Sequence, residues 1–359
     1  MHISTSDEQF ASDNWAGLCP EALEYLARAN QGFVGAYGSD AWTQKAADTL
    51  RELFQTDCAV FFLATGTASN ALALSALCRP YQSVICHEAA HIATSECGAT
   101  EFFCGGSTLL PGKGDHGKLT PDSVTALAGL PSGVHRQAPG ALSITQLTEF
   151  GTLYTVEELK ALKATAERHD LGIHMDGARF ANAVAALGVA PAELSWKVGV
   201  DVLCLGGSKN GGCIGEAVLF FDRELAAGFD YRCKQAGQLI SKMRYVTAPW
   251  LGLLETGAWL ANARHANSCA TELEAALSRI EGVQVMYPCQ GNSVFARFPR
   301  PLIRHLRRNW QFHDFFEEDV VRLMCSWNTT HERIARFVGD VEAGLALGLG
   351  EETDGGAEP

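Results

Sequence analysis

Apolar and amphipathic stretches alternate along the first two thirds of the chain. Apolar runs that predict buried strands occur at about 58–63, 83–86, 101–104, 141–146, 171–175, 202–205 and 216–221. Stretches with helical periodicity occur at about 41–54, 68–78, 90–98, 156–168 and 178–187. This alternation predicts an α/β fold, with a mostly parallel sheet and helices on both of its faces. Ligands of such sheets bind at the carboxyl ends of the strands.

The pattern changes beyond about residue 246. The later elements are a long helical stretch, short strands near 283–286 and 293–298, and a terminal helix from about residue 331. We therefore predict a large domain over residues 1–245 and a small domain over residues 246–348. Residues 349–359 are rich in glycine and acidic residues, which predicts a disordered tail.

Composition and charge narrow the class of protein. The chain of 359 residues has 28 Lys and Arg against 41 Asp and Glu, which argues against nucleic acid or an anionic membrane as a partner. No apolar run is long enough to span a membrane, and the N-terminus lacks a signal-peptide core. The twelve cysteines are scattered without a C-x-x-C pair, and Cys86 and Cys204 lie inside apolar strand patterns. We expect reduced thiols and a cytoplasmic protein.

Two predicted strands end in residues that can bind pyridoxal phosphate. Asp176 follows I-H-M in the stretch 173–179, and Lys209 follows the apolar run V-L-C-L-G-G-S. A lysine can form the Schiff base with this cofactor, and a carboxylate can protonate its ring nitrogen. A structural ion pair between Asp176 and Lys209 is the alternative.

A third predicted strand ends in a candidate phosphate site. Thr65, Gly66 and Thr67 form a turn of small residues between the apolar run and an alanine-rich helix. Gly66 permits close approach of the backbone, and the N–H groups of the following helix form an anion site. Alone, the turn also fits an ordinary helix start with a threonine N-cap. The downstream order of Asp176 and Lys209 favours the cofactor phosphate.

These stretches, with S-D-N at Ser12, G-A-Y-G at residues 35–38, H-I at His91 and V-R-L at residues 321–323, resemble the low-specificity L-threonine aldolases and phenylserine aldolases. The resemblance runs from about residue 10 to about residue 340. It implies the pyridoxal phosphate fold of aspartate aminotransferase, called fold type I. It also implies retro-aldol cleavage of L-β-hydroxy-α-amino acids to glycine and an aldehyde, with Lys209 and Asp176 in the cofactor roles given above.

The resemblance implies further roles around the cofactor. His91 matches a histidine that stacks on the cofactor ring, and His135 matches a second active-site histidine. Arg179 and Arg322 match arginines near the cofactor hydroxyl and the substrate carboxylate. Ser12 matches a contact to that carboxylate. The base that removes the β-hydroxyl proton would be His91, His135 or a water held by either, with preference for His135 or the water.

The resemblance also implies an oligomer and leaves one residue without a role. Tyr37, Lys234 and Arg244 match positions that face a neighbouring subunit's substrate and cofactor, which implies a homodimer or a dimer of dimers, a homotetramer. Many relatives have E-N-T-H where this chain has T-E-F-G at residues 148–151. The role of Glu149 and the preferred aldehyde therefore stay open.

Alternative functions arise from other patterns. His87, Glu88 and His91 match H-E-x-x-H, a zinc-hydrolase signature, for which possible third ligands are Glu96, Glu101 and His116. This motif follows a strand directly and does not lie inside a long helix, so we predict no metal.

Pyridoxal phosphate enzymes of the same fold also catalyse β-elimination, dehydration, transamination or racemisation. A binding protein without catalysis is the remaining class, and the presence of Lys209, Asp176 and the phosphate turn together argues against it.

Two further motifs have ordinary structural interpretations. The glycine-rich stretch 112–118 matches part of a nucleotide-binding loop, but Leu119 stands where Ser or Thr is required, and a helix with Thr120 as N-cap starts only afterwards. We predict a surface turn. The basic cluster of Arg300, Arg304, Arg307 and Arg308 precedes an acidic stretch, and it predicts a solvated helix face and no nucleic-acid site.

Overall fold

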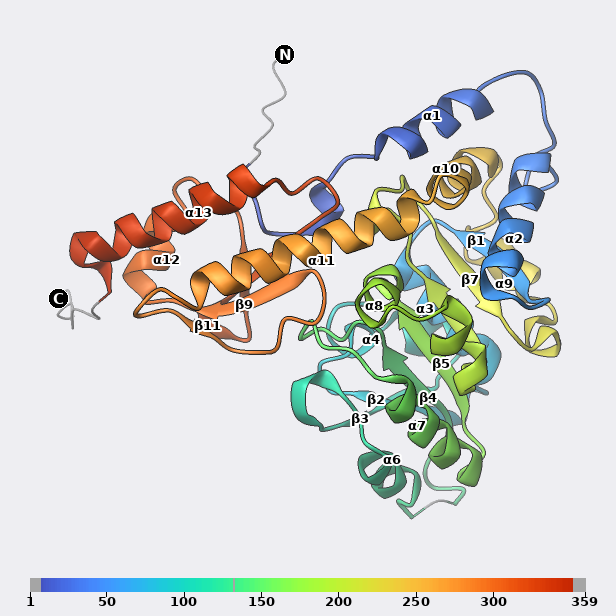
Figure 1. Cartoon of the computed structure of the whole chain (residues 1–359). Helices are drawn as coiled ribbons and strands as arrows, with labels where there is room; N and C mark the ends of the chain where they lie inside the picture. The colour runs from blue at the N-terminus through green and yellow to red at the C-terminus, as the bar shows by residue number, and fades with distance from the viewer. Residues whose placement is uncertain (1–7, 132, 351–359) are drawn as a thin grey trace, which may run out of the picture.

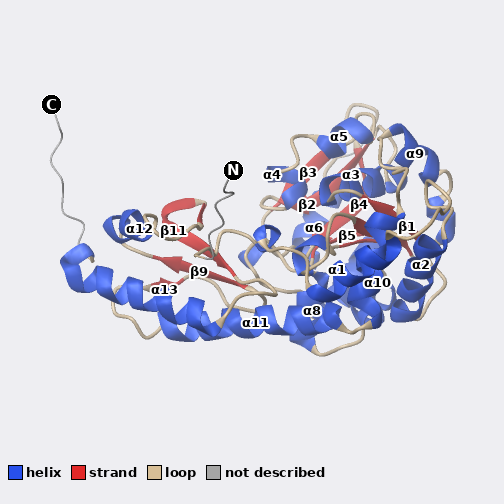
Figure 2. Ribbon diagram, turned by 90° about the horizontal axis from the view of Figure 1, so that it is seen from above, coloured by secondary structure: helices blue, strands red, loops and turns tan. Residues whose placement is uncertain are grey.

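The chain forms two sheets joined by a long helix, and the computed structural model describes residues 8–131 and 133–350. Figure 1 shows the larger sheet with its helices at one end of the molecule, and the smaller sheet at the other end. Helix α11 (Ala258–Leu277) runs from one part to the other. Seen from above in Figure 2, the two parts form separate lobes.

The large sheet has seven strands in the order β1-β7-β6-β5-β4-β2-β3. They are β1 (Ala59–Leu63), β2 (Gln82–His87), β3 (Thr108–Gly112), β4 (Ala138–Thr145), β5 (Gly172–Gly177), β6 (Val202–Leu205) and β7 (Glu216–Phe220). Only β7 runs antiparallel to its two neighbours. The carboxyl ends of the other six strands therefore lie at one edge of the sheet, as the sequence predicts.

Both faces of this sheet are buried. Along β6, Leu203 and Leu205 belong to one apolar core, whereas Val202 and Cys204 belong to another. Successive strand residues point to opposite faces, so an uninterrupted apolar strand needs helices on both sides. The helices of this part are α1 (Pro20–Ala29), α2 (Ala41–Phe54), α3 (Gly66–Leu77), α4 (His91–Thr94), α5 (Ala99–Phe103), α6 (Pro121–Ala128), α7 (Val156–Arg168), α8 (Phe180–Leu187), α9 (Phe229–Gln235) and α10 (Arg244–Glu255).

The small sheet has four antiparallel strands in the order β10-β11-β9-β8. Its elements are β8 (Gln284–Val285), β9 (Ser293–Arg297), α12 (Arg300–Leu306), β10 (His313–Phe315), β11 (Glu317–Met324) and α13 (His331–Gly344). Its apolar core includes Phe10 from the N-terminal segment, whose N–H and C=O bond to Gln311 and Met324. The N-terminal segment is thus attached to the small sheet.

The proposed domain boundary between residues 245 and 246 lies inside α10, after its second residue. Helix α10 packs against α1 and α2, whereas α11 contacts both α8 of the large part and α13 of the small part. The boundary stays a prediction. Residues 351–359 of the predicted tail lie outside the described residues.

Four local features differ from the sequence predictions. Residues 101–104, predicted as a strand, lie in and just after helix α5, where Phe103 packs on the core and Phe102 is exposed. A short apolar run does not distinguish a strand from a buried helix. Strand β3 was missed because it contains Pro111, which an edge strand such as β3 tolerates. The helix predicted at 90–98 is only the single turn α4, and β10 and β11 were not predicted.

The glycine-rich stretch 112–118 and the basic arginine cluster both have ordinary structural roles. A short 3-10 turn occupies Asp115–Gly117, and α6 begins at Pro121 with Thr120 as N-cap, as predicted. In the basic cluster, Arg300 pairs with Glu318 and Arg307 pairs with Asp314.

Among the described residues, no helix is long and apolar enough to cross a membrane. All twelve cysteines are described and none is paired in a disulfide.

Candidate functional site

A cavity of about 420 Å³ lies at the carboxyl edge of the large sheet, where the small sheet meets it. The N-terminal segment, the loops after the parallel strands β1, β2, β4, β5 and β6, and the small sheet all supply side chains. The lining includes the predicted site residues Ser12, Thr65, Gly66, Thr67, His91, Asp176, Arg179, Lys209 and Arg322. The structure therefore brings together nine residues that are up to 310 positions apart in the sequence.

The turn after β1 forms the start of helix α3. Thr65 is the N-cap, and its hydroxyl accepts a hydrogen bond from the Ala68 N–H at 3.2 Å. A Cβ added at Gly66 would meet no protein atom within 4 Å, so the backbone here faces open space in the cavity. The first N–H groups of a helix have no partner within it. A phosphate group can therefore approach the backbone at Gly66 and Thr67.

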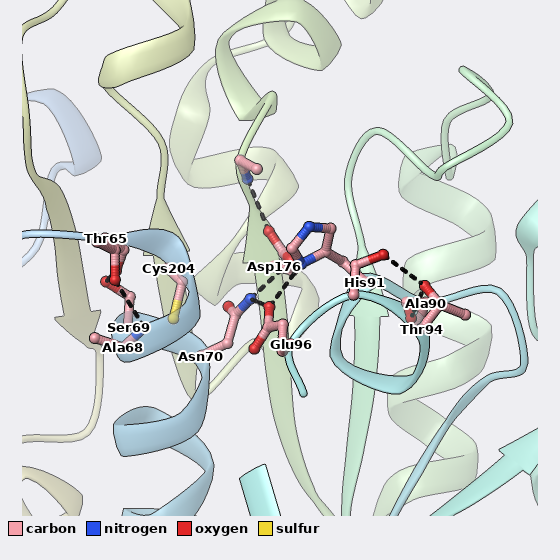
Figure 3. A network of polar contacts seen from close by, with 12 residues as sticks. Thr65, Ala68, Ser69, Asn70, Ala90, His91, Thr94, Glu96, Asp176 and Cys204 are labelled. Atoms are coloured by element: carbon pink, nitrogen blue, oxygen red, sulfur yellow. Dashed lines mark hydrogen bonds and ion pairs between the residues drawn. The ribbon is translucent and has the colours of Figure 1, made fainter. Parts of the chain in front are cut away.

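Asp176 lies at the end of β5, and its carboxylate is fixed on both oxygens. The Asn70 amide donates to Oδ2 at 2.9 Å, and the Ala178 N–H donates to Oδ1 at 3.0 Å. The same Asn70 amide donates to Glu96 Oε1, which is also 2.8 Å from His91 Nδ1. Figure 3 shows this chain of contacts from His91 through Glu96 and Asn70 to Asp176. The chain fixes the positions of the histidine and the aspartate relative to each other.

His91 presents an open ring to the cavity. Its side chain is 45% exposed although its neighbour Glu96 is fully buried. The hydrogen bond to Glu96 raises the pKa of His91, against the effect of burial, and the charge of Asp176 adds to the rise. The ring is thus held at one edge, with room for a flat group beside it.

Lys209 lies in a short 3-10 turn (Ser208–Asn210) after β6. The turn is held by Asn210, whose amide donates to the Trp259 C=O at 2.6 Å, and by packing of Gly207, where an added Cβ would lie 2.4 Å from Trp250. Burial lowers the pKa of Lys209, and the charge of Arg179 lowers it further. A neutral amine is the nucleophilic form, so this environment favours attack on a carbonyl carbon.

Arg179 is neutralised by an acid from the N-terminal segment. Its Nε lies 2.7 Å from Asp13 Oδ2 and its Nη2 lies 2.9 Å from Oδ1, a bidentate pair with a 1% exposed aspartate side chain. Burial would raise the pKa of Asp13, but the charge and hydrogen bonds of Arg179 outweigh burial and hold this pKa below its usual value. Asn292 from the small part also donates to Asp13 at 3.1 Å.

Arg322, on β11 of the small sheet, has no such partner. Among the described residues no carboxylate lies within ion-pair distance, and its best protein contact is a 3.4 Å hydrogen bond to the Ala11 C=O. Its Nε is buried without a hydrogen-bond partner. Burial and the charge of Arg179 lower the pKa of Arg322 to about 10. A buried guanidinium without an acid favours an anionic ligand, and a carboxylate can occupy both of its donors.

Four predicted residues do not line this cavity. His135 is exposed, and it precedes β4, so it lies toward the sheet edge opposite the cavity. Tyr37, Lys234 and Arg244 lie together on another surface: Lys234 Nζ is 4.6 Å from the centre of the Tyr37 ring, and Arg244 bonds to the backbone at Gly32. These three residues are not part of the same chain's site.

Sequence reasoning missed several residues of the site. Asn70 and Glu96 connect His91 to Asp176, and Asp13 pairs with Arg179. Asn70 lies one helical turn after Gly66, so its position on α3 was a usable signal. Asp13 stands next to Ser12 in the S-D-N motif. Glu149, whose role was open, lines the cavity.

The zinc interpretation of His87 and His91 finds no support in the geometry. Nε2 of His87 lies 2.9 Å from the Gly114 C=O, and Nδ1 accepts the Ala89 N–H at 3.1 Å, so both ring nitrogens are engaged by backbone. Nδ1 of His91 is held by Glu96. Within residues 8–131 and 133–350, no group of three or more His, Cys, Asp or Glu side chains is placed to hold a metal ion.

Comparison with known proteins places this site in a family. Residues 9–298 match the model of the beta-eliminating lyase family. A low-specificity L-threonine aldolase of a Pseudomonas species is 52% identical over 342 residues, which cover 95% of this chain and 99% of that protein. The low-specificity L-threonine aldolase of Pseudomonas aeruginosa is 53% identical over 335 residues, 93% of this chain and 97% of that protein. The chain belongs to the low-specificity L-threonine aldolase family.

Membership of the threonine aldolase family confirms the predicted fold and cofactor. The solved structure of Leishmania major threonine aldolase superposes with a TM-score of 0.88 at 28% identity, covering 94% of this chain and 99% of that one. The mixed, mostly parallel sheet is that of fold type I pyridoxal phosphate enzymes. The threonine aldolases are pyridoxal phosphate-dependent aldehyde-lyases, and the open backbone at Gly66, the fixed carboxylate of Asp176 and the buried amine of Lys209 fit this cofactor.

Proposed function

We propose that this protein cleaves L-threonine and related L-β-hydroxy-α-amino acids to glycine and an aldehyde, with pyridoxal phosphate attached to Lys209. The observation that carries this proposal is that Lys209, the fixed carboxylate of Asp176 and the unpaired guanidinium of Arg322 line one cavity. When bound, pyridoxal phosphate supplies an electron-withdrawing ring that weakens the bonds at the amino-acid Cα.

The chain's own residues would position this cofactor. Thr65, Gly66 and Thr67 would hold the phosphate at the start of α3. Asp176, with Asn70 and the Ala178 N–H on its two oxygens, would keep a negative charge directed at the ring nitrogen. His91 has a side chain that is 45% exposed, and its ring would cover one face of the cofactor. Arg179 would donate to the cofactor's hydroxyl. Because Asp13 neutralises its charge, the pair would add no net positive charge beside the substrate.

Arg322 would bind the substrate carboxylate and so choose which bond breaks. A carboxylate fixed by Arg322 would orient the Cα–Cβ bond for cleavage. Ser12 lines the same cavity, where it would add a second contact to the carboxylate. Because both contacts would hold the carboxylate on one side, we expect L amino acids to be cleaved in preference to D.

The products of L-threonine test the proposal directly. We expect acetaldehyde and glycine in equal amounts, because an aldolase breaks the Cα–Cβ bond. A dehydratase on the same fold would instead expel water and yield 2-oxobutanoate and ammonia. One sample divided between an alcohol-dehydrogenase-coupled and a lactate-dehydrogenase-coupled assay measures both routes. L-Phenylserine should likewise give benzaldehyde, and 2-oxoacid without aldehyde from either substrate would contradict aldol cleavage.

We further propose a homodimer or a dimer of dimers, in which Tyr37, Lys234 and Arg244 contribute to a neighbouring subunit's site. The support is a surface on which Tyr37 is 51% exposed beneath the Lys234 amine and the nearby Phe33 is fully exposed. Exposed aromatic side chains together with cations are typical of subunit contacts.

Sedimentation of the purified protein tests this assembly. We expect a dimer or tetramer at micromolar concentration, and we expect Phe33→Asp to weaken it, because the substitution places a charge in an apolar contact. Exposed Phe102→Asp, from α5, serves as the matched control and should leave the assembly unchanged. A fully active wild-type monomer would contradict the proposal.

We also propose that the protein resides in the cytoplasm. All twelve cysteines are unpaired and most are buried. Burial raises the pKa of several of these thiols, including that of Cys86 to about 12, which keeps them protonated and unreactive. Such thiols are typical of a reducing compartment.

A further inference from the structure

Aldol cleavage requires an acceptor for the proton of the substrate's β-hydroxyl. Most ionisable groups of the cavity already make hydrogen bonds or ion pairs within the protein. Both oxygens of Asp176 accept hydrogen bonds from Asn70 and Ala178. Asp13 is paired with Arg179, and Nδ1 of His91 is held by Glu96. His135, the base preferred from the sequence, does not line the cavity.

Of the remaining carboxylates that line the cavity, Glu216 accepts hydrogen bonds on both oxygens, whereas Glu96 and Glu149 each have one buried oxygen without a partner. The other oxygen of Glu96 is shared by His91 and Asn70 and its side chain is fully buried, so we take Glu149 as the candidate. It lies in the loop after β4 and lines the cavity. Its Oε1 accepts the backbone N–H of His91 at 2.7 Å, whereas its Oε2 is buried and has no hydrogen-bond partner. A buried carboxylate oxygen without a partner costs free energy, typically about 1–3 kcal/mol. Such an atom in a functional cavity indicates a ligand that satisfies it.

The loop holds Glu149 in place. Thr148 Oγ1 lies 2.8 Å from Thr152 Oγ1, and both hydroxyls donate to the His116 C=O. Gly151 has a φ of 71°, and an added Cβ there would lie 2.4 Å from Ser293 Oγ, so the loop is packed against the small sheet. The carboxylate is therefore positioned by the scaffold and by the same residue, His91, that faces the cofactor site.

We propose that Glu149 is the base that accepts the β-hydroxyl proton, an inference that rests on the proposed aldol cleavage. The O–H bond breaks and its proton passes to the Glu149 carboxylate. The O–H electron pair becomes the second bond of the aldehyde C=O, and the Cα–Cβ electron pair stays on Cα. No oxidant or reductant is required: Cα takes up one proton, either the one returned by Glu149 or one from solvent, to give glycine, and in the second case Glu149 releases its proton to solvent.

The electrostatics of the cavity support this role. Burial raises the pKa of Glu149 to about 7, and the charge of Asp176 contributes, while the His91 N–H acts in the opposite direction. A carboxyl group with a pKa near 7 can both take up and release a proton at neutral pH. The other ionisable groups around it are Arg179 at the start of α8, Cys86 of β2 and Tyr154 of its own loop.

His91 is less suited to accept the proton. Its Nδ1 is held by Glu96 at 2.8 Å, and a ring that covers one face of the cofactor would not also direct a nitrogen at the β-hydroxyl. We therefore assign His91 a positioning role, in which its backbone N–H orients Glu149 and its ring faces the cofactor.

Glu149→Gln tests the assignment, because glutamine keeps the volume and can still accept the His91 N–H but cannot take up a proton. We expect the rate of acetaldehyde release from L-threonine to fall about 10²–10⁴-fold. The visible cofactor band should be unchanged. Exchange of the glycine α-proton with D₂O, which involves no β-hydroxyl, should stay within about threefold of wild type. Glu149→Asp, which keeps the carboxylate, should recover part of the lost rate.

Glu101→Gln is the matched control, because Glu101 also has a buried oxygen without a partner but does not line the cavity. It should leave aldehyde release unchanged. Equal losses of cleavage and of glycine exchange in Glu149→Gln, or no loss of cleavage, would overturn the role of Glu149. A wild type that releases no aldehyde would instead overturn the proposed function.

A thermal measurement provides a readout that is independent of turnover. The pKa of Glu149 is higher in the folded than in the unfolded chain, so the ionised carboxylate destabilises the folded state; this loss is absent below the ordinary value of 4.5, develops as the pH rises above it, and is complete once the pH has passed about 7. We expect Glu149→Gln to have the Tm of wild type at about pH 4 and a Tm higher by roughly 3–6 °C at about pH 8. A Tm difference that does not change with pH would contradict a desolvated carboxylate at this position.

Discussion

Replacement of Lys209 by alanine should give a folded protein that lacks the visible absorption band of the wild type and has lost its activity by at least about a thousandfold. The amine is the attachment point proposed for the cofactor, and no second lysine lines the cavity among the described residues. Folding should persist because burial already disfavours the charged amine, as its lowered pKa indicates. The absorption spectrum before and after borohydride measures the attachment.

Lys113→Ala is the matched control for this substitution. Lys113 is exposed in the glycine-rich surface turn and does not line the cavity. It should keep both the band and the activity. A Lys209→Ala protein that retains a borohydride-sensitive band would show that another amine carries the cofactor.

Arg322→Ala should lower kcat/KM by about 10²–10⁴-fold, with both a lower kcat and a higher KM. A guanidinium that binds a carboxylate forms two charge-assisted hydrogen bonds, each contributing roughly 1.5–3 kcal/mol. Because the same contacts orient the Cα–Cβ bond, part of their energy is expressed only in the transition state. Steady-state kinetics with L-threonine separate the two parameters.

Arg307→Ala is the control for the loss of a positive charge in the same part of the molecule, because Arg307 is paired with Asp314 at the surface. Its kinetics should match those of wild type. An Arg322→Ala effect confined to KM would show that Arg322 binds the substrate without orienting it.

Much of the large sheet and of its binding edge could be predicted from the sequence. The strands that precede Thr65, Asp176 and Lys209 are short and apolar, and the carboxyl ends of parallel strands meet at one edge. The pattern of apolar residues along the sequence was therefore sufficient to predict that these three residues lie together. It failed where local signals are ambiguous, at residues 101–104, which are helical, and at β3, where Pro111 obscures an edge strand.

The rest of the site depends on contacts that no local pattern contains. Arg322 reaches the cavity from the small sheet, and Asp13 reaches it from the N-terminal segment. The resemblance to the threonine aldolases pointed to Arg322. It gave no indication that Asp13 neutralises Arg179 whereas Arg322 has no acidic partner. It also favoured His135, which lies toward the opposite edge of the sheet, and left Glu149 without a role.

The attachment of the N-terminal segment has a consequence for how the protein is made. Asp13 emerges early from the ribosome, but its partner Asn292 lies 279 residues later. At about 5–20 residues per second, those 279 residues take roughly 15–55 s to synthesise. During that time the large sheet can form around Arg179, while the small sheet that anchors Phe10 does not yet exist. The nascent chain must therefore remain soluble with an unfinished catalytic centre until translation is nearly complete.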